Sequence, residues 1–332
     1  MIQPYFETEL GKLYHGDCLE ILPQLPMVDL ILTDPLYNIK KAVWDSKENY
    51  YYWLISVFQS CEKISKGNAT LWFFHMVFSD LAEIHKLLEE ETSYRHKQLI
   101  TINKGLGSIA GRCSIKKLRS FPRATEYLQF YTFEDRTGAE QLSERYQRIN
   151  PMAEYLRSEF KRAKITSSEI TKLFPSKTGG LTGCVSNWLL GLNFPLKNQY
   201  EKMREYLNGE YLRQEYEDLR QEYEYLRQEY EDLRYYFDLP KGFTDVWDIN
   251  FYTEKNMGHE TPKPTSLIGF IINATLRDEG VALDPFMGSG TLAVACERLN
   301  RRWIGIEISK EYCDIAVDRI KKETAQLKLE LP

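Results

Sequence analysis

Short apolar runs alternate with longer mixed segments over residues 10–132 of the chain. The apolar runs have the length of β-strands, and strands are expected at residues 12–15, 29–33, 69–75, 98–103 and 126–132. The mixed segments between them are expected to form helices at residues 19–22, 51–64 and 79–89. Strands and helices that alternate in this way predict an α/β fold with a parallel sheet.

The same alternation returns after residue 265, behind a stretch of different character. Helices are expected at residues 266–276, 291–299 and 310–321, and strands at residues 281–283 and 303–306. We therefore expect one discontinuous domain, whose two halves flank an insertion. The halves are residues 1–132 and 251–332, and the insertion is residues 133–250.

The insertion is expected to contain two short helices that a glycine turn separates. Residues 165–175 carry Ser and Thr suited to cap a helix, and Pro175 closes it. Gly179 and Gly180 precede a second expected helix at residues 181–190. This pattern resembles a helix-turn-helix, in which base or phosphate contacts would come from Ser176, Lys177, Thr178, Ser186 and Asn187. Many small helical modules share the pattern, so a purely structural module is the alternative.

Four similar heptads follow at residues 210–237 and predict a coiled-coil helix of about 42 Å. Aromatic residues recur at position a and leucines at position d, namely Tyr216, Tyr223, Tyr230 and Phe237, and Leu212, Leu219, Leu226 and Leu233. Glu at g and Arg at e would pair between two parallel copies, as Glu215 with Arg220. Because soluble monomers rarely expose such an apolar stripe, we expect a homodimer through this helix. Cover by the rest of the insertion is the alternative.

The distribution of charge along the chain indicates basic segments in a chain that is acidic overall. The 332 residues carry a formal net charge of −5, so no overall basic field indicates a nucleic-acid partner. Lys and Arg gather instead in residues 95–123 and 157–177. A local basic surface is what contact with phosphates needs, and an ordinary solvated surface is the alternative.

Cysteine usage and hydropathy limit the class of protein further. The six cysteines are scattered, and no histidine stands at metal-ligand spacing, so neither a disulfide framework nor a metal site is expected. No apolar run approaches the roughly 20 residues that cross a bilayer. We expect a soluble, cytoplasmic protein without a membrane partner.

Two turns carry the candidate chemistry. The segment Asp284-Pro285-Phe286-Met287-Gly288-Ser289-Gly290 links an expected strand to an expected helix. A strand, a glycine turn and a helix N-terminus let backbone N–H groups approach a nucleotide-type ligand closely. The segment Thr33-Asp34-Pro35-Leu36-Tyr37 also ends a strand, at the rim where open α/β sheets bind ligands. Together the two turns favour an enzyme of the S-adenosylmethionine (SAM) type.

With these motifs the chain resembles the β-class amino DNA methyltransferases, in which an Asp-Pro-Pro-Tyr-type motif precedes a Phe-x-Gly-x-Gly cofactor motif. The resemblance covers roughly residues 10–132 and 256–325. Other matching positions are residues 15–22, Asn38, Trp44, Asp45, residues 125–128, 259–264 and 303–308, Glu311 and Tyr312. The chain departs from the family at Leu36, where a second proline is usual, and at Thr125, where a histidine is usual.

The resemblance implies a Rossmann-like SAM-dependent methyltransferase sheet that is discontinuous in sequence. Residues 1–132 would be its catalytic half and residues 251–332 its SAM-binding half. Residues 133–250 would form a mostly helical target-recognition region that contains the heptad helix. The expected reaction is sequence-specific methylation of double-stranded DNA in a restriction–modification setting, without a metal. Catalytic residues would be Asp34, Pro35, Leu36 and Tyr37, and cofactor-binding residues Asp17, Cys18, Asp34, Lys263, Pro264, Thr265, Asp284, Phe286, Met287, Gly288, Ser289, Gly290, Thr291 and Glu307.

The amino nitrogen of a base is a poor nucleophile because the ring delocalises its lone pair. The Asp34 carboxylate and the Pro35 carbonyl could accept the two amino hydrogens as the methyl group arrives. Tyr37 could stack on the extruded base, because the target atom cannot be reached inside a duplex. A helix N-cap is the alternative role for Asp34, and a core aromatic for Tyr37. Leu36 can keep the Pro35 carbonyl in place only if neighbouring packing holds the backbone.

For the cofactor, the resemblance assigns the ribose hydroxyls of SAM to Glu307 and its adenine to Asp17, with the Cys18 N–H beside it. Lys263, Pro264 and Thr265 would line the methionine end. Ordinary surface positions are the alternative for Asp17 and Lys263. The aspartate of the catalytic motif favours adenine N6 as the target, because cytosine-N4 enzymes of this family more often carry serine there. Cytosine-N4 methylation and a catalytically impaired DNA- or partner-binding module remain alternatives.

Overall fold

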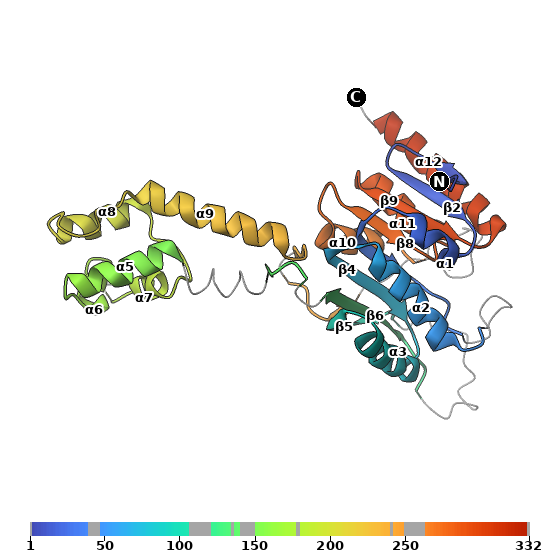
Figure 1. Ribbon diagram of the computed structural model, residues 1–332, viewed down its shortest axis with the longest axis horizontal. Coiled ribbons are helices and arrows are strands. Elements are labelled where there is room, and N and C mark those ends of the chain that lie inside the picture. The colour runs from blue at the N-terminus through green and yellow to red at the C-terminus, as the bar shows by residue number, and fades with distance from the viewer. Residues whose placement is uncertain are drawn as a thin grey trace. The chain divides into compact units, whose positions relative to one another are not determined.

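The computed structural model describes most of the chain as two compact units (Figure 1). The described residues are 2–38, 47–105, 121–133, 136–139, 150–176, 180–239, 242–248 and 263–330. The first unit combines residues 1–136 with 235–332, and the second is residues 137–234. Residues 235–248, which the sequence analysis assigned to the insertion, thus belong to the first unit. Among the described helices, none has both the length and the apolar character needed to cross a membrane.

Within the described residues, the first unit is built on one sheet of nine strands in the order β1-β2-β9-β8-β3-β4-β6-β5-β7. In chain order these are β1 (Phe6–Glu7), β2 (Gly11–His15), β3 (Val28–Thr33), β4 (Ser65–His75), β5 (Tyr94–Asn103), β6 (Thr125–Phe133), β7 (Val246–Asp248), β8 (Val281–Asp284) and β9 (Arg302–Glu307). Strands β8 and β9 come from the end of the chain and lie between β2 and β3 from its beginning. The two halves of the sequence therefore form a single sheet.

The expectation of a parallel sheet was wrong at two places. Strand β6 lies between β4 and β5 and runs antiparallel to both, with Phe130 opposite Trp72 and Leu128 opposite Ile100. The short β1 is antiparallel to β2. A strand that returns beside its predecessor needs no crossover helix, so the alternation of strands and helices does not determine its direction.

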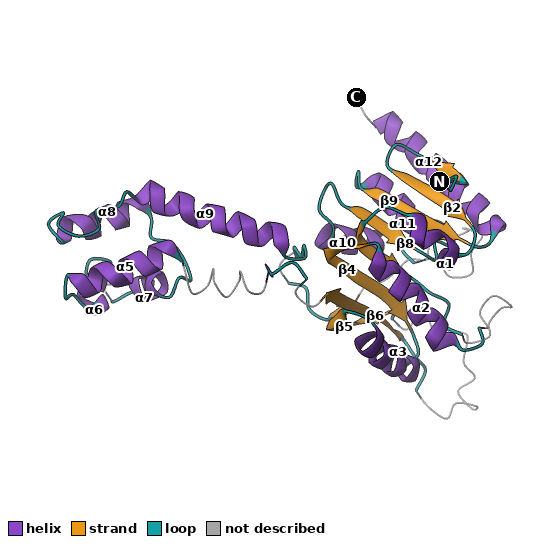
Figure 2. Cartoon of the chain, in the orientation of Figure 1, coloured by secondary structure: helices purple, strands orange, loops and turns teal. Residues whose placement is uncertain are grey.

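Helices cover both faces of the sheet (Figure 2). One face packs against α1 (Cys18–Ile21), α2 (Tyr50–Lys63) and α3 (Phe78–Glu91), and the other against α10 (Thr265–Thr275), α11 (Thr291–Arg298) and α12 (Lys310–Glu330). Strand β3 shows why both faces are apolar: Ile31 belongs to the first core, whereas Leu30 and Leu32 belong to the second. Side chains of a strand alternate between faces, so a strand buried on both sides is a nearly continuous apolar run.

The second unit is a small helical domain with a core of its own. Its described helices are α5 (Pro151–Arg162), α6 (Ser167–Thr171), α7 (Cys184–Leu189), α8 (Lys197–Tyr206) and α9 (Tyr216–Leu233). Helix α6 starts with a capping box between Thr166 and Glu169. A bridge between Pro175 and Leu181 links α6 to α7. Two expected contact residues of the helix-turn-helix, Lys177 and Thr178, lie outside the described residues, so that assignment stays a prediction.

The heptad helix is shorter than its repeats predict. Helix α9 covers Tyr216–Leu233, not residues 210–237. Leu212 precedes it with a φ of 54° and is fully buried, and its N–H donates to Glu159 at 2.9 Å. Beyond the other end, Phe237 stacks on Phe130 in the first unit at 5.7 Å between ring centroids. Tertiary packing thus overrides the repeat at both ends.

Candidate active site

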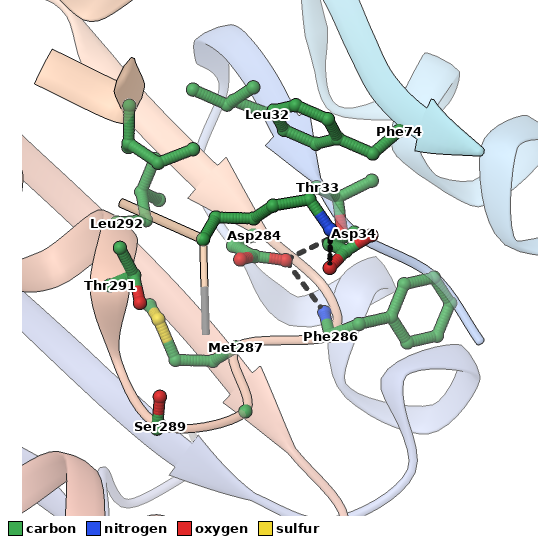
Figure 3. Close-up of a pocket in the computed structure, with 13 residues that line it drawn as sticks. Leu32, Thr33, Asp34, Phe74, Asp284, Phe286, Met287, Ser289, Thr291 and Leu292 are labelled. Carbon is green, nitrogen blue, oxygen red and sulfur yellow. Dashed lines mark hydrogen bonds and ion pairs between the residues drawn. The ribbon is translucent and has the colours of Figure 1, made fainter. Parts of the chain in front are cut away.

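The two motifs meet at one edge of the sheet. Strands β3 and β8 are parallel neighbours, with Ile31 opposite Leu283. The residues that follow each strand are therefore at the same edge, and Figure 3 shows Thr33, Asp34 and Asp284 next to one another. The Thr33 hydroxyl donates a hydrogen bond to Asp284 Oδ1 at 2.6 Å. A cavity opens there, lined by Leu32, Thr33, Asp34, Phe74, Lys263, Ile268, Asp284, Phe286, Met287, Gly288, Ser289, Thr291 and Leu292.

The glycine turn has a backbone that other residues would adopt only with strain. Gly288 and Gly290 have φ values of 53° and 83°. A Cβ on Gly290 would also lie 2.9 Å from the Cβ of Ala316. The backbone N–H of Gly288 donates to Glu307 Oε2 at 2.8 Å, which ties the turn to the end of β9. The turn is thus held open toward the cavity.

Helix α12 contacts Ser289 of the glycine motif and Thr291, the residue that follows the motif. Ser289 is buried, and Arg319 donates to both its carbonyl, at 2.7 Å, and its hydroxyl, at 2.8 Å. The same guanidinium group lies 3.2 Å from the hydroxyl of Thr291. These contacts fix the start of α11, the helix whose N-terminus faces the cavity.

The same edge of the sheet also brings together the residues expected to hold the nucleoside part of a cofactor. Strands β2 and β9 are parallel, with His15 opposite Glu307, so Asp17 and Cys18 follow close to Glu307. Glu307 is 7% exposed. Burial raises the pKa of its carboxyl group, although backbone N–H groups of Ser309 and Gly288 oppose that effect.

Asp17 has a structural role at this edge. Its side chain accepts a hydrogen bond from the N–H of Leu19 at 2.8 Å and caps α1. A carboxylate has about four lone-pair sites, so this bond leaves capacity for a ligand. Pro264 is the N-cap residue of α10, and Thr265, the first residue of that helix, is buried.

Asp34 lies at the centre of a cluster of charged side chains. Its Oδ1 accepts a hydrogen bond from the Tyr37 hydroxyl at 2.5 Å, and its Oδ2 pairs with the ammonium group of Lys263. The Tyr37 hydroxyl also lies 2.8 Å from Glu126 Oε1. Lys263, expected at the methionine end of the cofactor, thus contacts the Asp34 carboxylate, which is expected to be catalytic, as well as lining the cavity.

Glu126 is the site residue that sequence reasoning missed. It is 3% exposed, and ion pairs join it to Lys263 at 3.2 Å and Lys104 at 2.8 Å. Burial alone would raise the pKa of its carboxyl group, but the two lysines outweigh burial and lower the pKa to about 2. A signal was available, because Glu126 is the one charged residue of strand β6. Its partners, however, are distant in sequence.

The turn after Asp34 is held by packing. Leu36 packs against the core on the α2 face, and Pro35 is buried. The Tyr50 hydroxyl donates to the Leu36 carbonyl at 2.8 Å and lies 3.2 Å from His75 Nε2. Burial lowers the pKa of His75, whose ring is 4.8 Å from that of Tyr37. The packing that leucine needs in place of a second proline is therefore present.

Several expectations concern residues outside the described ranges, and they stay expectations. They are the family matches Trp44, Asp45 and residues 259–262, and the part of the basic stretch 95–123 that includes Arg112, Lys116, Lys117 and Arg119.

The fold and the paired motifs define a SAM-dependent methyltransferase. The chain matches the sequence model of the N6/N4 family described as DNA methylase over residues 28–318, and it belongs to that family. The family includes enzymes that methylate adenine at N6 and enzymes that methylate cytosine at N4. Membership therefore gives SAM as the methyl donor and leaves the target base open.

Curated relatives carry the names of Type II methyltransferases. M.ScaI of Streptomyces caespitosus is 24% identical over 98% of this chain and 86% of its own length. M.BamHI of Bacillus amyloliquefaciens is 25% identical over 99% of this chain, which spans 61% of that relative. M.HpaI of Haemophilus parainfluenzae is 42% identical, but the match covers only 24% of this chain and 26% of the relative.

Solved structures support the fold. The M1.HpyAVI–SAM complex matches with a TM-score of 0.51 and 19% identity over 93% of this chain and 100% of that one. The PvuII DNA methyltransferase, described as cytosine-N4-specific, matches with a TM-score of 0.53 and 16% identity over 97% and 93% of the two chains. At these identities the likeness concerns the fold alone.

Proposed function

We propose that this protein is a sequence-specific DNA methyltransferase that transfers the methyl group of SAM to the N6 amino group of an extruded adenine. One observation carries the proposal: the Thr33–Asp284 hydrogen bond of 2.6 Å joins the Asp34 motif to the glycine motif. A methyl donor bound at the second motif would then lie against the acceptor groups of the first. Proximity of this kind supplies a large part of the catalysis of group transfer.

The donor set suits SAM, which supplies an electrophilic methyl group on a sulfonium. Glu307 would accept the ribose hydroxyls with the lone pairs that Gly288 and Ser309 do not use. Asp17 and the Cys18 N–H would meet the adenine ring. The methionine part would lie along the cavity. Its lining would come from Lys263, Pro264, Thr265, Asp284, Phe286, Met287, Gly288, Ser289, Gly290 and Thr291.

Catalysis would come from the Asp34 turn. The Asp34 carboxylate and the Pro35 carbonyl accept the two hydrogens of the target amino group, so that its lone pair becomes available for the methyl group. Tyr37 contributes a ring for stacking on the base. Leu36 contributes its backbone, which the Tyr50 hydrogen bond at 2.8 Å supports.

Asp34 also supports adenine over cytosine, since the resemblance associates serine at this position with cytosine-N4 enzymes. Cytosine N4 is the second candidate, because both bases present an exocyclic amino group to the same acceptors. A catalytically impaired binding module is disfavoured, since Asp34, Tyr37, Gly288, Gly290 and Glu307 are all retained.

Residues 133–250 would supply target recognition, and a homodimer would form through helix α9. The remaining stripe of α9 supports a partner: Tyr223, Leu226, Tyr230 and Leu233 are only partly buried. Duplex DNA is the proposed substrate, in a restriction–modification setting.

The test of the proposed function is modification-sensitive sequencing of DNA from a host that expresses the protein. We expect N6-methyladenine at one short sequence, absent from DNA of the host without the gene. N4-methylcytosine at such a sequence would contradict adenine as the proposed target base. Unmodified DNA would contradict the proposed methyltransferase activity.

A further inference from the structure

Asp34 has both carboxylate oxygens engaged. Oδ1 accepts from the Tyr37 hydroxyl at 2.5 Å, and Oδ2 pairs with the Lys263 ammonium group. An ammonium group is a stronger partner for a carboxylate than the neutral amino group of a base. The target amino group must therefore compete with Lys263 for Oδ2, and withdrawal of Lys263 would remove that competition.

Glu126 offers a second position for the same ammonium group. Its Oε1 already forms an ion pair with Lys263 Nζ at 3.2 Å, so a small movement would shift the ammonium group onto Glu126. Its Oε2 is already held by Lys104 at 2.8 Å. The Glu126 side chain is 4% exposed, whereas that of Asp34 is 32% exposed. Lys263 thus contacts one buried carboxylate, that of Glu126, and one partly exposed carboxylate, that of Asp34.

The surroundings permit the movement at low cost. Lys263 Nζ lies 4.8 Å from the centre of the Phe74 ring, a favourable cation–π contact. The ammonium group stays paired with a carboxylate before and after the shift, so no buried charge is left alone. Once Lys263 sits on Glu126, the Asp34 carboxyl group is available to the target amino group.

We propose that Lys263 occupies Asp34 before the target amino group binds and that Glu126 receives its ammonium group when the target amino group binds. Glu126 is then a positioning residue, because it acts on the base through Lys263. The inference rests on the proposed function of Asp34, and it applies equally to an adenine or a cytosine amino group.

The test is a double-mutant cycle on methyl transfer, with tritiated SAM at saturation and unmethylated genomic DNA. Glu126→Gln removes the charge but keeps an amide oxygen for the Tyr37 hydroxyl. We expect it to lower kcat at least about tenfold while KM for SAM changes less than about threefold. In a Lys263→Met background no ammonium group needs a second position, so the same substitution should lower kcat less than about threefold.

Two results would overturn the inference: no loss of kcat in Glu126→Gln, or equal losses of kcat in both backgrounds. Thermal unfolding checks that each variant is folded, and Lys263→Gln replaces Lys263→Met if the latter is not. A wild type that methylates no DNA would instead contradict the proposed function.

Discussion

The Thr33 hydroxyl donates to Asp284 Oδ1 at 2.6 Å and thereby joins the end of β3 to the end of β8. The same oxygen accepts the backbone N–H of Phe286 at 2.9 Å. Asp284 is 7% exposed, and burial, partly offset by these two hydrogen bonds, raises the pKa of its carboxyl group to about 7. One buried carboxyl group thus orders both motifs of the site.

This relationship predicts a pH-dependent stability. Because the pKa of Asp284 is higher in the folded than in the unfolded chain, the stability that its protonated form provides is lost as pH rises through about 7. Asp284→Asn keeps an Oδ1 acceptor and cannot ionise. The difference in free energy of unfolding between Asp284→Asn and the wild type should change with pH. It should shift by about 1–3 kcal/mol in favour of Asp284→Asn between pH 5 and pH 8.

Chemical denaturation of both proteins at pH 5 and pH 8 measures this difference in free energy of unfolding. Titrations of other groups cancel in the difference between the two proteins. If the difference in free energy of unfolding is the same at pH 5 and pH 8, the pKa of Asp284 is not raised in the folded protein.

Glu307→Ala should weaken SAM binding. The variant removes the proposed acceptor of the ribose hydroxyls and the partner of the Gly288 N–H, which is 2.8 Å away. The loss of one charge-assisted hydrogen bond costs about 1.5–3 kcal/mol, so calorimetry should show an affinity lower by roughly ten- to a hundredfold. The SAM affinity of Glu307→Gln, which keeps one acceptor oxygen, should lie between the affinities of the wild type and Glu307→Ala. Equal affinities for wild type and Glu307→Ala would remove Glu307 from the cofactor site.

Helix α9 should mediate self-association through the part of its stripe that its own unit leaves partly open. Leu219 is 3% exposed in the core of the second unit, so a charge there would unfold that unit. Leu226→Asp with Tyr230→Asp instead changes partly buried positions. Light scattering should show a wild-type dimer and a monomeric variant that keeps its helical circular dichroism. If the wild type is itself a monomer, the dimer proposal fails.

Much of the sheet could be predicted from sequence because periodicity reports burial. Strand β3 was expected at residues 29–33 and is observed at Val28–Thr33, and β9 was expected at 303–306 and is observed at Arg302–Glu307. The direction of β6 could not be predicted, because a strand between two others has the same apolar pattern in either direction.

The charged cluster shows the limit for the site. The Asp34 and glycine motifs each consist of neighbouring residues at a strand end, so local sequence predicts their position, whereas Glu307 was assigned by the family resemblance. Glu126 reaches Tyr37 across 89 positions, and Lys263 reaches Asp34 across 229. Only the arrangement of β3, β6 and α10 in the fold brings these groups together.

The heptads show a similar limit. Their repeat predicts one uninterrupted seam, but the positive φ of Leu212 and the stacking of Phe237 on Phe130 remove both ends from the helix. Periodicity identifies an apolar stripe without identifying what covers it.

The most direct test of the central claim compares wild type with Asp34→Ala by mass spectrometry of nucleosides from treated DNA, together with SAM calorimetry. We predict N6-methyladenine from the wild type and none from the variant. The variant should bind SAM within about threefold of the wild-type affinity, since Asp34 acts on the base. N4-methylcytosine from the wild type, or a methylated base produced by Asp34→Ala at the wild-type level, would contradict the account.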